Sequence, residues 1–242
     1  MRTRSRPSKY SDYVVNYTTN DATLFEFLSV DMESFRAGAD NKWYPHSSAI
    51  CKAALKKSGR IEIISGPYMY IHYDVILKSY EKLHGPTSSC AHLLKVTQAH
   101  AENAKVCAFE DFLSLIKNET IVGFNVHADV SVITNACALL GLTFTPKNLI
   151  DLRDLVAVHN NVFLDFFPPG KMIPAPGPYA SLQELIRFVR DDLKFVQKHW
   201  GSEDVLLNIE LMEFMTRTLS CNIPTSSPAT FQNHNNRPCQ KV

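Results

Sequence analysis

Residues 24–34 read LFEFLSVDMES, and this stretch decides how the chain is expected to fold. Apolar side chains fill almost every position from Leu24 to Val30, which is typical of a strand buried on both faces of a sheet. Asp31 and Glu33 follow directly, and residues two apart on a strand project from the same face. The stretch therefore predicts a buried central strand that carries two neighbouring carboxylates.

Two carboxylates in so apolar a strand repel each other and lose hydration, so they call for a proton or a cation between them. Hard oxygen ligands with few thiolates nearby favour Mg²⁺ or Mn²⁺. The alternative is that the strand ends at Val30 and that water solvates both acids at its tip. An Asp-x-Glu pair is too common to decide between these interpretations by itself.

After this strand the chain continues in short apolar segments separated by turn residues. Residues 47–57, 60–64 and 68–75 read SSAICKAALKK, RIEII and YMYIHYDV, with the turn signals Lys-Ser-Gly-Arg and Ser-Gly-Pro between them. Gly and Pro at such positions are typical of the turns that join antiparallel strands. We therefore expect an antiparallel meander that continues from the first strand and forms half of a sheet.

The second half of the chain alternates between helical and extended patterns. Apolar spacing and end signals predict helices over 109–116, 125–140, 153–159, from the capping box Ser181–Glu184 to about Gln197, and from about Ser202. Short strands are expected at 121–124 and 148–152. Together these elements indicate an α/β fold with a mixed five-stranded sheet, an antiparallel meander followed by parallel strands, flanked by helices.

Two further motifs carry candidate ligands. Asn125 and Asp129 are four residues apart, which places them on one face of the predicted helix. The alternative is that Asn125 caps this helix while Asp129 faces water, and both roles are compatible for Asn125.

His199 and Asp204 form the last motif, in the sequence KHWGSED. Five residues on a regular helix would place these side chains roughly 140° apart, so they converge only if a helix begins between them. Gly201 suits a loop and Ser202 suits an N-cap. We therefore expect His199 in the preceding loop and Asp204 in the first turn of the final helix.

The three motifs, taken in order and in this context, resemble those of the DEDDh branch of the DEDD exonuclease superfamily, whose fold is ribonuclease H-like. The resemblance covers about residues 24 to 219 and includes the stretch FEDFLSLIKNETIVGFNVHAD. This chain has Phe124 where the family often has His, and Val205 where it often has Ala. Neither difference removes a ligand.

The resemblance implies a 3′-to-5′ exonuclease that releases nucleoside 5′-monophosphates from single-stranded RNA or DNA. It implies that two Mg²⁺ or Mn²⁺ ions are held by four acids and that a histidine acts as general base. The implied site residues are Asp31, Glu33, Asp129 and Asp204 as metal ligands and His199 as the base. We expect the 3′ nucleotide to contact Met32, Ser34, Phe35 and Asn125, with core packing as the alternative role of Phe35.

Composition is compatible with this interpretation. The 242 residues are 45% hydrophobic and 20% charged with a net charge of +1, so affinity for nucleic acid must come from local patches.

We expect one domain over residues 21–219 between a flexible basic tail at 1–20 and a flexible tail at 220–242, with no assigned role for the Pro-rich stretch Asn160–Pro178. The sequence has no apolar run long enough for a membrane helix or a signal peptide, and Asp12 argues against a mitochondrial leader. We therefore expect an intracellular protein, cytoplasmic or nuclear, that is not bound to membranes.

Other functions stay open at this point. The chain can be a catalytically silent module that binds nucleic acid or protein on the same fold, or another two-metal hydrolase such as an endonuclease. A zinc site is disfavoured, because only Cys90 and His92 are closely spaced and no Cys-x-x-Cys pair is present. The sequence also leaves a homodimer open and does not distinguish RNA from DNA.

Overall fold

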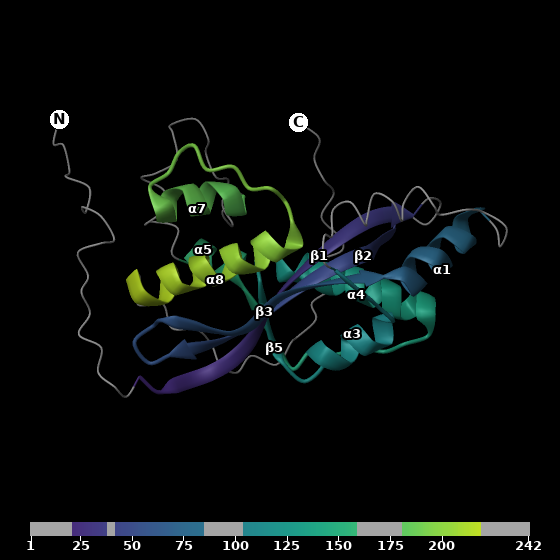
Figure 1. Ribbon diagram of the computed structural model, residues 1–242, viewed down its shortest axis with the longest axis horizontal. Helices are drawn as coiled ribbons and strands as arrows, with labels where there is room; N and C mark the ends of the chain where they lie inside the picture. Colours follow the sequence, from purple (N-terminus) through teal and green to yellow (C-terminus); the bar gives the residue numbers. More distant parts are fainter. Residues whose placement is uncertain (1–20, 38–41, 85–103, 159–180, 219–242) are drawn as a thin grey trace.

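The computed structural model describes residues 21–37, 42–84, 104–158 and 181–218 (Figure 1). The expectations for the two tails, for Asn160–Pro178 and for Cys90 and His92 lie outside these residues. Among the described helices, none is both long and apolar enough to cross a lipid bilayer.

A mixed sheet with the strand order β4-β3-β2-β1-β5-β6 forms the centre of the molecule. Its strands are β1 (Thr23–Ala37), β2 (Lys42–Lys56), β3 (Ile61–His72), β4 (Lys105–Cys107), β5 (Thr120–Gly123) and β6 (Asn148–Asp151). The first three are antiparallel, whereas β4 pairs parallel with β3, β5 with β1, and β6 with β5. This confirms the predicted α/β fold, whose topology is consistent with a ribonuclease H-like sheet.

The described sheet has six strands and not the five expected. The additional strand is β4, which pairs with β3 through only three residues, Lys105 to Cys107. So short a segment shows no alternation that sequence inspection could detect, and its pairing depends on the position of β3.

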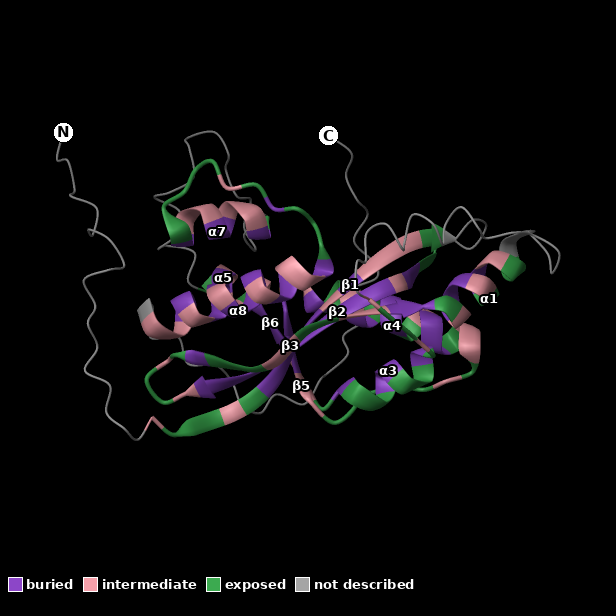
Figure 2. Ribbon diagram, viewed as in Figure 1, coloured by how far each residue is buried: buried purple, intermediate pink, exposed green. Residues whose placement is uncertain are grey.

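Helices cover both faces of the sheet (Figure 1). They are α1 (Tyr73–His84), α3 (Phe109–Ile116), α4 (Val126–Leu140), α5 (Leu152–Val158), α7 (Leu182–Arg190) and α8 (Gly201–Thr218). Successive residues of the central strands belong to opposite cores. Figure 2 shows buried residues along these strands and on the helices that cover them. Phe27 and Val122 pack with α5, α7 and α8, whereas Leu28 and Ile121 pack with α3 and α4.

Several local predictions are confirmed. Helix α4 ends where Gly141 adopts the left-handed conformation (φ 72°), which glycine accepts without strain. Helix α7 begins with a complete capping box, in which the Ser181 side chain accepts from the Glu184 backbone and the Glu184 carboxylate accepts from the Ser181 N–H. The central position of β1 in the sheet is confirmed as well, but the expected burial holds only from Phe27 to Val30, because Leu24 is 53% exposed.

Three local predictions were wrong. Ser-Gly-Pro at 65–67 is not a turn, because β3 runs through it with register shifts against β2 between Ile50 and Ala53. Gly66 makes this irregularity feasible, since it has φ 100° and a Cβ there would lie 2.9 Å from the Ile50 carbonyl oxygen. The residues after His72 begin helix α1 and do not extend the strand.

The third error concerns α7, which ends at Arg190 and not near Gln197. Asp191 adopts a left-handed conformation (φ 50°), and its N–H donates to the carbonyls of Arg187 and Phe188. The chain from Asp191 to Trp200 is therefore a loop that leads into α8.

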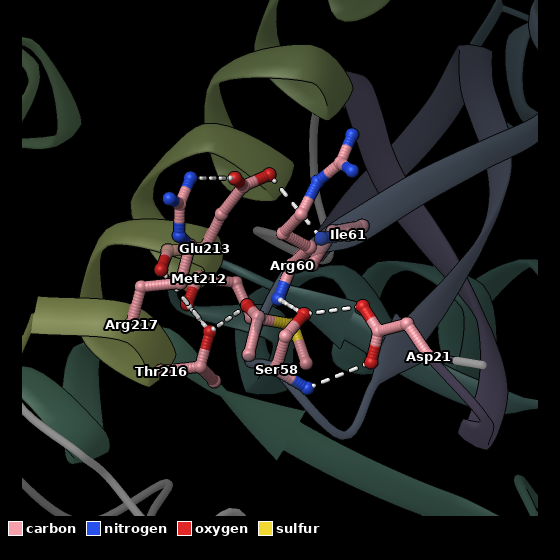
Figure 3. A network of polar contacts seen from close by, with 9 residues as sticks. Asp21, Ser58, Arg60, Ile61, Met212, Glu213, Thr216 and Arg217 are labelled. Atoms are coloured by element: carbon pink, nitrogen blue, oxygen red, sulfur yellow. Dashed lines mark hydrogen bonds and ion pairs between the residues drawn. The ribbon is translucent and has the colours of Figure 1, made fainter. Parts of the chain in front are cut away.

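Helix α8 is attached to the sheet near its C-terminal end (Figure 3). The Thr216 hydroxyl donates to the Gly59 carbonyl over 2.6 Å, and the Ile61 N–H donates to the Glu213 carboxylate over 3.2 Å. Ser58 in the same turn bonds to Asp21, just before β1. The β2–β3 hairpin, the start of β1 and the end of α8 thus form one polar network.

His72 is a fully buried histidine in the core on the α3 side of the sheet. Its Nε2 lies 2.9 Å from the Ser48 hydroxyl oxygen, and its ring centroid lies 5.0 Å from that of Phe109 and 4.8 Å from that of Phe112. Burial, with a smaller contribution from His46, lowers the pKa of His72 to about 3. The folded protein therefore holds this ring in its neutral form.

We predict that His72 makes the fold sensitive to acid. Its stabilising contribution is fully present above the unfolded pKa of about 6.5 and is lost as the pH falls towards 3, which amounts to about 2 kcal/mol between pH 7 and pH 5. Urea unfolding of the wild type and of His72→Gln at both pH values measures this, because the variant retains a polar group for Ser48 but does not titrate. Equal losses in the two proteins would contradict the assignment.

Candidate functional site

Carboxylates from opposite ends of the chain meet beside β1. Ligand oxygens of Asp31, Glu33 and Asp204 all lie within 4.8 Å of one another. Asp31 and Glu33 leave the same face of β1, and Asp204 comes from the first turn of α8. Asp204 is buried and the other two are partly buried. The two motifs that are farthest apart in the sequence therefore form one acidic cluster.

The start of α8 determines where Asp204 lies. The Trp200 carbonyl accepts hydrogen bonds from the N–H groups of Glu203 and Asp204 over 2.8 and 2.9 Å. The helix therefore begins at Gly201, and the prediction that Ser202 is its N-cap was wrong. His199 lies in the preceding loop with a left-handed backbone (φ 54°), and Asp204 lies in the first helical turn, as predicted.

Gly201 permits a close approach between α8 and the sheet. A Cβ at this position would lie 3.1 Å from the Ala49 Cβ and 3.3 Å from Asp31 Oδ2. One turn further on, the Ser29 hydroxyl donates to the Val205 carbonyl over 2.9 Å. These contacts fix the distance between Asp31 and Asp204, and neither was anticipated from the sequence.

Asp129 lies beside the cluster, on the first turn of α4. Its carboxylate accepts a hydrogen bond from the Met32 N–H and is close enough to Asp31 to raise the pKa of that acid. The backbone donor of Met32 is thus used within the protein. The structure places Asp129 next to Asp31 but outside the group of three convergent carboxylates.

Asn125 does not share a helical face with Asp129, because it precedes α4 with a left-handed backbone (φ 65°). Its side chain does not cap the helix either, since Oδ1 accepts from Arg153 over 3.3 Å. Its backbone N–H donates to Asp151 Oδ1 over 2.9 Å. Asn125 therefore occupies the N-cap position of α4 without a side-chain cap, and the helical face expected to be shared with Asp129 was wrong.

The remaining expected substrate contacts lie where β1 becomes irregular. The register against β2 shifts between Glu33 and Ser34, and Ser34 is partly buried. Phe35 packs towards the α4 side, with its ring centroid 6.4 Å from Tyr44 and 6.3 Å from His46. The Met32 side chain is buried in the same core. The side chains of Met32 and Phe35 therefore belong to the core opposite the acidic cluster.

Burial dominates the electrostatics of the acidic cluster. It raises the pKa of Asp31 well above the ordinary value, and the charges of Asp129, Asp204 and Glu33 raise this pKa further. Burial likewise raises the pKa values of Glu33 and Asp204, while nearby His199 opposes this in both cases. So many confined carboxylates are stable as anions only beside a cation.

The donor set fits a hard divalent cation. Three carboxylate oxygens can reach a common point, and oxygen ligands of this kind suit Mg²⁺ or Mn²⁺. Among the described residues, no cysteine belongs to a group of three convergent ligands.

Sequence inspection missed two features near the cluster. Gln197 is buried and its amide donates to Asp204 Oδ1 over 2.8 Å, although its position had suggested the end of a helix. A second group, His127, Asp151 and Asp154, brings its ligand atoms within 4.8 Å of one another, with His127 and Asp154 exposed. Residues from three separate elements form this group, and their spacing in the sequence matches no recognisable ligand motif.

The chain matches no known protein-family profile, and no curated protein matches it in sequence.

We predict that Gly201→Ala destabilises the protein by about 1–2 kcal/mol, because crowding against Ala49 costs about 1–3 kcal/mol and the gain in helix propensity returns at most about 1 kcal/mol. Chemical denaturation measures the difference. Ser202→Ala is the matched control, since Ser202 is not the N-cap and its replacement should cost less than the ~1 kcal/mol of a lost cap. A Gly201→Ala protein more stable than the wild type would show that α8 is not held this closely.

We predict that Asp31→Asn stabilises the metal-free protein at neutral pH. A carboxyl with a raised folded pKa contributes stability below its unfolded pKa of about 3.9 and loses that contribution as the pH rises through the folded value. Removing the charge should raise the melting temperature by about 2–4 °C at pH 7.5 in EDTA, which corresponds to about 1 kcal/mol. The exposed Asp111→Asn on α3 is the control, and a lower melting temperature for Asp31→Asn would refute the charge burial.

Proposed function

We propose that this protein is a metal-dependent nuclease that removes nucleotides from the 3′ end of single-stranded nucleic acid. One observation carries the proposal: Asp31, Glu33 and Asp204 converge within 4.8 Å although about 170 residues separate the first from the last. Such a confined set of acids has no evident stabilising role, because burial disfavours its charged form. A divalent cation would make the arrangement favourable.

In this proposal Asp31, Glu33 and Asp204 hold two Mg²⁺ or Mn²⁺ ions, and Asp129 assists directly or through water. The ions, when bound, supply positive charge for the attacking and leaving oxygens of the scissile phosphate. The carboxylates would hold these ions beside β1. Asp129 is itself oriented by the Met32 N–H.

His199 is the proposed general base. Its side chain is exposed and lies near enough to Glu33 and Asp204 to lower the pKa values of both. A neutral imidazole can accept a proton, so this residue suits removal of a proton from the attacking water. Its position in a loop allows it to approach the water once substrate is bound.

The direction of cleavage and the single-stranded substrate rest on the resemblance to DEDDh exonucleases. Attack of water on the terminal phosphodiester would release nucleoside 5′-monophosphates. Ser34, partly buried at the register shift after Glu33, remains a candidate for contact with the 3′ nucleotide. Both RNA and DNA are substrates to be tested.

A nuclease assay tests the proposal directly. With Mg²⁺ or Mn²⁺, RNA and DNA strands labelled at the 5′ end should shorten stepwise, and EDTA should stop the reaction. Asp31→Ala and Asp204→Ala should each lower the rate more than about 100-fold, since loss of a residue that only hydrogen-bonds to a metal ligand already costs about 10–100-fold. Asp111→Ala is the matched control and should retain wild-type activity.

The same assay separates the competing functions. Cleavage of a circular strand would indicate an endonuclease, whereas intact strands with a folded, pure protein would favour a silent binding module. Near-wild-type activity of either Asp31→Ala or Asp204→Ala would refute the proposed ligands.

A further inference from the structure

The loop between α7 and α8, residues 191–200, contains one well-buried residue. Most of its side chains are exposed, including Leu193 and Val196 at 66% each, whereas Gln197 is only 7% exposed. An uncharged amide buried in an otherwise exposed loop needs hydrogen-bond partners. The identity of these partners shows what the loop is built to hold.

Gln197 bonds to two different elements. Its side-chain amide donates to Asp204 Oδ1 over 2.8 Å, and its backbone N–H donates to the Gln183 side-chain oxygen on α7 over 2.8 Å. One residue therefore connects α7 to the carboxylate that α8 contributes to the cluster. Because one oxygen of Asp204 accepts this bond, rotation of the carboxylate is restricted.

Helix α7 makes further contacts with the same loop. Arg187 Nε donates to the Phe195 carbonyl over 2.8 Å, and the Arg190 guanidinium lies 4.6 Å from the Phe195 ring centroid. From the other side, the Lys198 N–H donates to the Glu203 carboxylate over 2.7 Å. The backbone is thus fixed at three positions within the four residues that precede His199.

The placement of α7 agrees with a role in holding this loop. Its apolar face, formed by Leu182, Leu185, Ile186 and Val189, is buried in the core that contains α8. Figure 1 shows α7 stacked on α8, on the side away from the sheet. Its polar residues Gln183 and Arg187 face the loop through the bonds described above.

We infer that Gln197 is a positioning residue for Asp204, and that Gln183 and Arg187 of α7 position the loop that carries His199. The inference rests on the proposed function for its catalytic consequence. Gln197 acts through Asp204, and α7 acts through the loop backbone. Loss of the Gln197 amide should therefore weaken metal binding, whereas loss of the Gln183 bond should affect the loop and leave the ligands in place.

The test compares Gln197→Met and Gln183→Met, which keep side-chain length but remove the amide. Mn²⁺ affinity is measured on the protein alone by paramagnetic resonance, and loop mobility by amide hydrogen exchange. We expect Gln197→Met to bind Mn²⁺ about 10-fold more weakly than the wild type. We expect Gln183→Met to bind Mn²⁺ normally but to exchange faster at residues 195–200.

Glu210→Gln is the matched control. Glu210 pairs with Arg190 over 2.7 Å between α7 and α8 but makes no bond to the loop backbone. This variant should leave Mn²⁺ affinity unchanged and should raise loop exchange less than Gln183→Met does, because it affects the loop only through the contact of Arg190 with the Phe195 ring. It thereby separates a general loosening of α7 from loss of the specific bonds to the loop.

Turnover of labelled strands gives an additional readout. Both Met variants should lower kcat about 10-fold with KM within about 3-fold of the wild type, because positioning residues affect the transition state more than binding. A merely structural role would instead lower the fraction of folded protein and leave kcat per folded molecule unchanged.

The outcomes distinguish the two claims. An inactive wild type refutes the proposed function, whereas wild-type Mn²⁺ affinity in folded Gln197→Met overturns the inference about Gln197. If the wild type binds no Mn²⁺, or if Gln197→Met does not fold, hydrogen exchange in Gln183→Met still tests whether α7 positions the loop. Wild-type exchange at residues 195–200 in that variant overturns the role of α7.

Discussion

The arrangement of the site depends on close contact between the start of α8 and the centre of the sheet. Gly201 lies where any side chain would meet Ala49 and Asp31, so the first helical turn approaches the strands more closely than a residue with a side chain would allow. Asp204 in that turn reaches Asp31 and Glu33 only because of this approach. The rest of α8 is held by apolar packing and by the polar network at its other end.

Burying these carboxylates opposes folding, and the two cores must offset the cost. Apolar contacts on both faces of β1 surround the acids, and the same burial raises their pKa values. An arrangement of charges that is unfavourable without a ligand is typical of functional sites, where residues needed for function lower the stability of the fold. The buried His72 behaves differently, because it has Ser48 as a partner and stays neutral.

The sequence was most informative where a local pattern has one structural solution. The apolar run before Asp31 predicted a strand, the helical spacing before Gly141 predicted α4, and the capping box at Ser181 predicted where α7 begins. The five-residue spacing of His199 and Asp204 also required a helix start between them. The exact first residue of α8 could not be predicted, because the first hydrogen bonds of the helix go to the Trp200 carbonyl.

Features that depend on tertiary contacts were not predictable. The Ser-Gly-Pro segment lies in a strand because β2 pairs with it on both sides of the irregularity, which local turn preference does not reveal. Gln197 gave no signal, since an isolated glutamine is common on surfaces and its burial depends on Asp204 and Gln183. Phe35 follows the carboxylates in sequence yet enters the opposite core after the register shift.

The attachment of α8 at both ends has a consequence for communication through the molecule. Its 18 residues extend over about 27 Å, from the acidic cluster to the turn between β2 and β3. Because Thr216 bonds to that turn while Gly201 rests on Ala49, a rigid rod connects two distant parts of the same meander. If α8 moves as a unit, a twist of the hairpin relative to the central strands would displace Asp204 relative to Asp31 and Glu33.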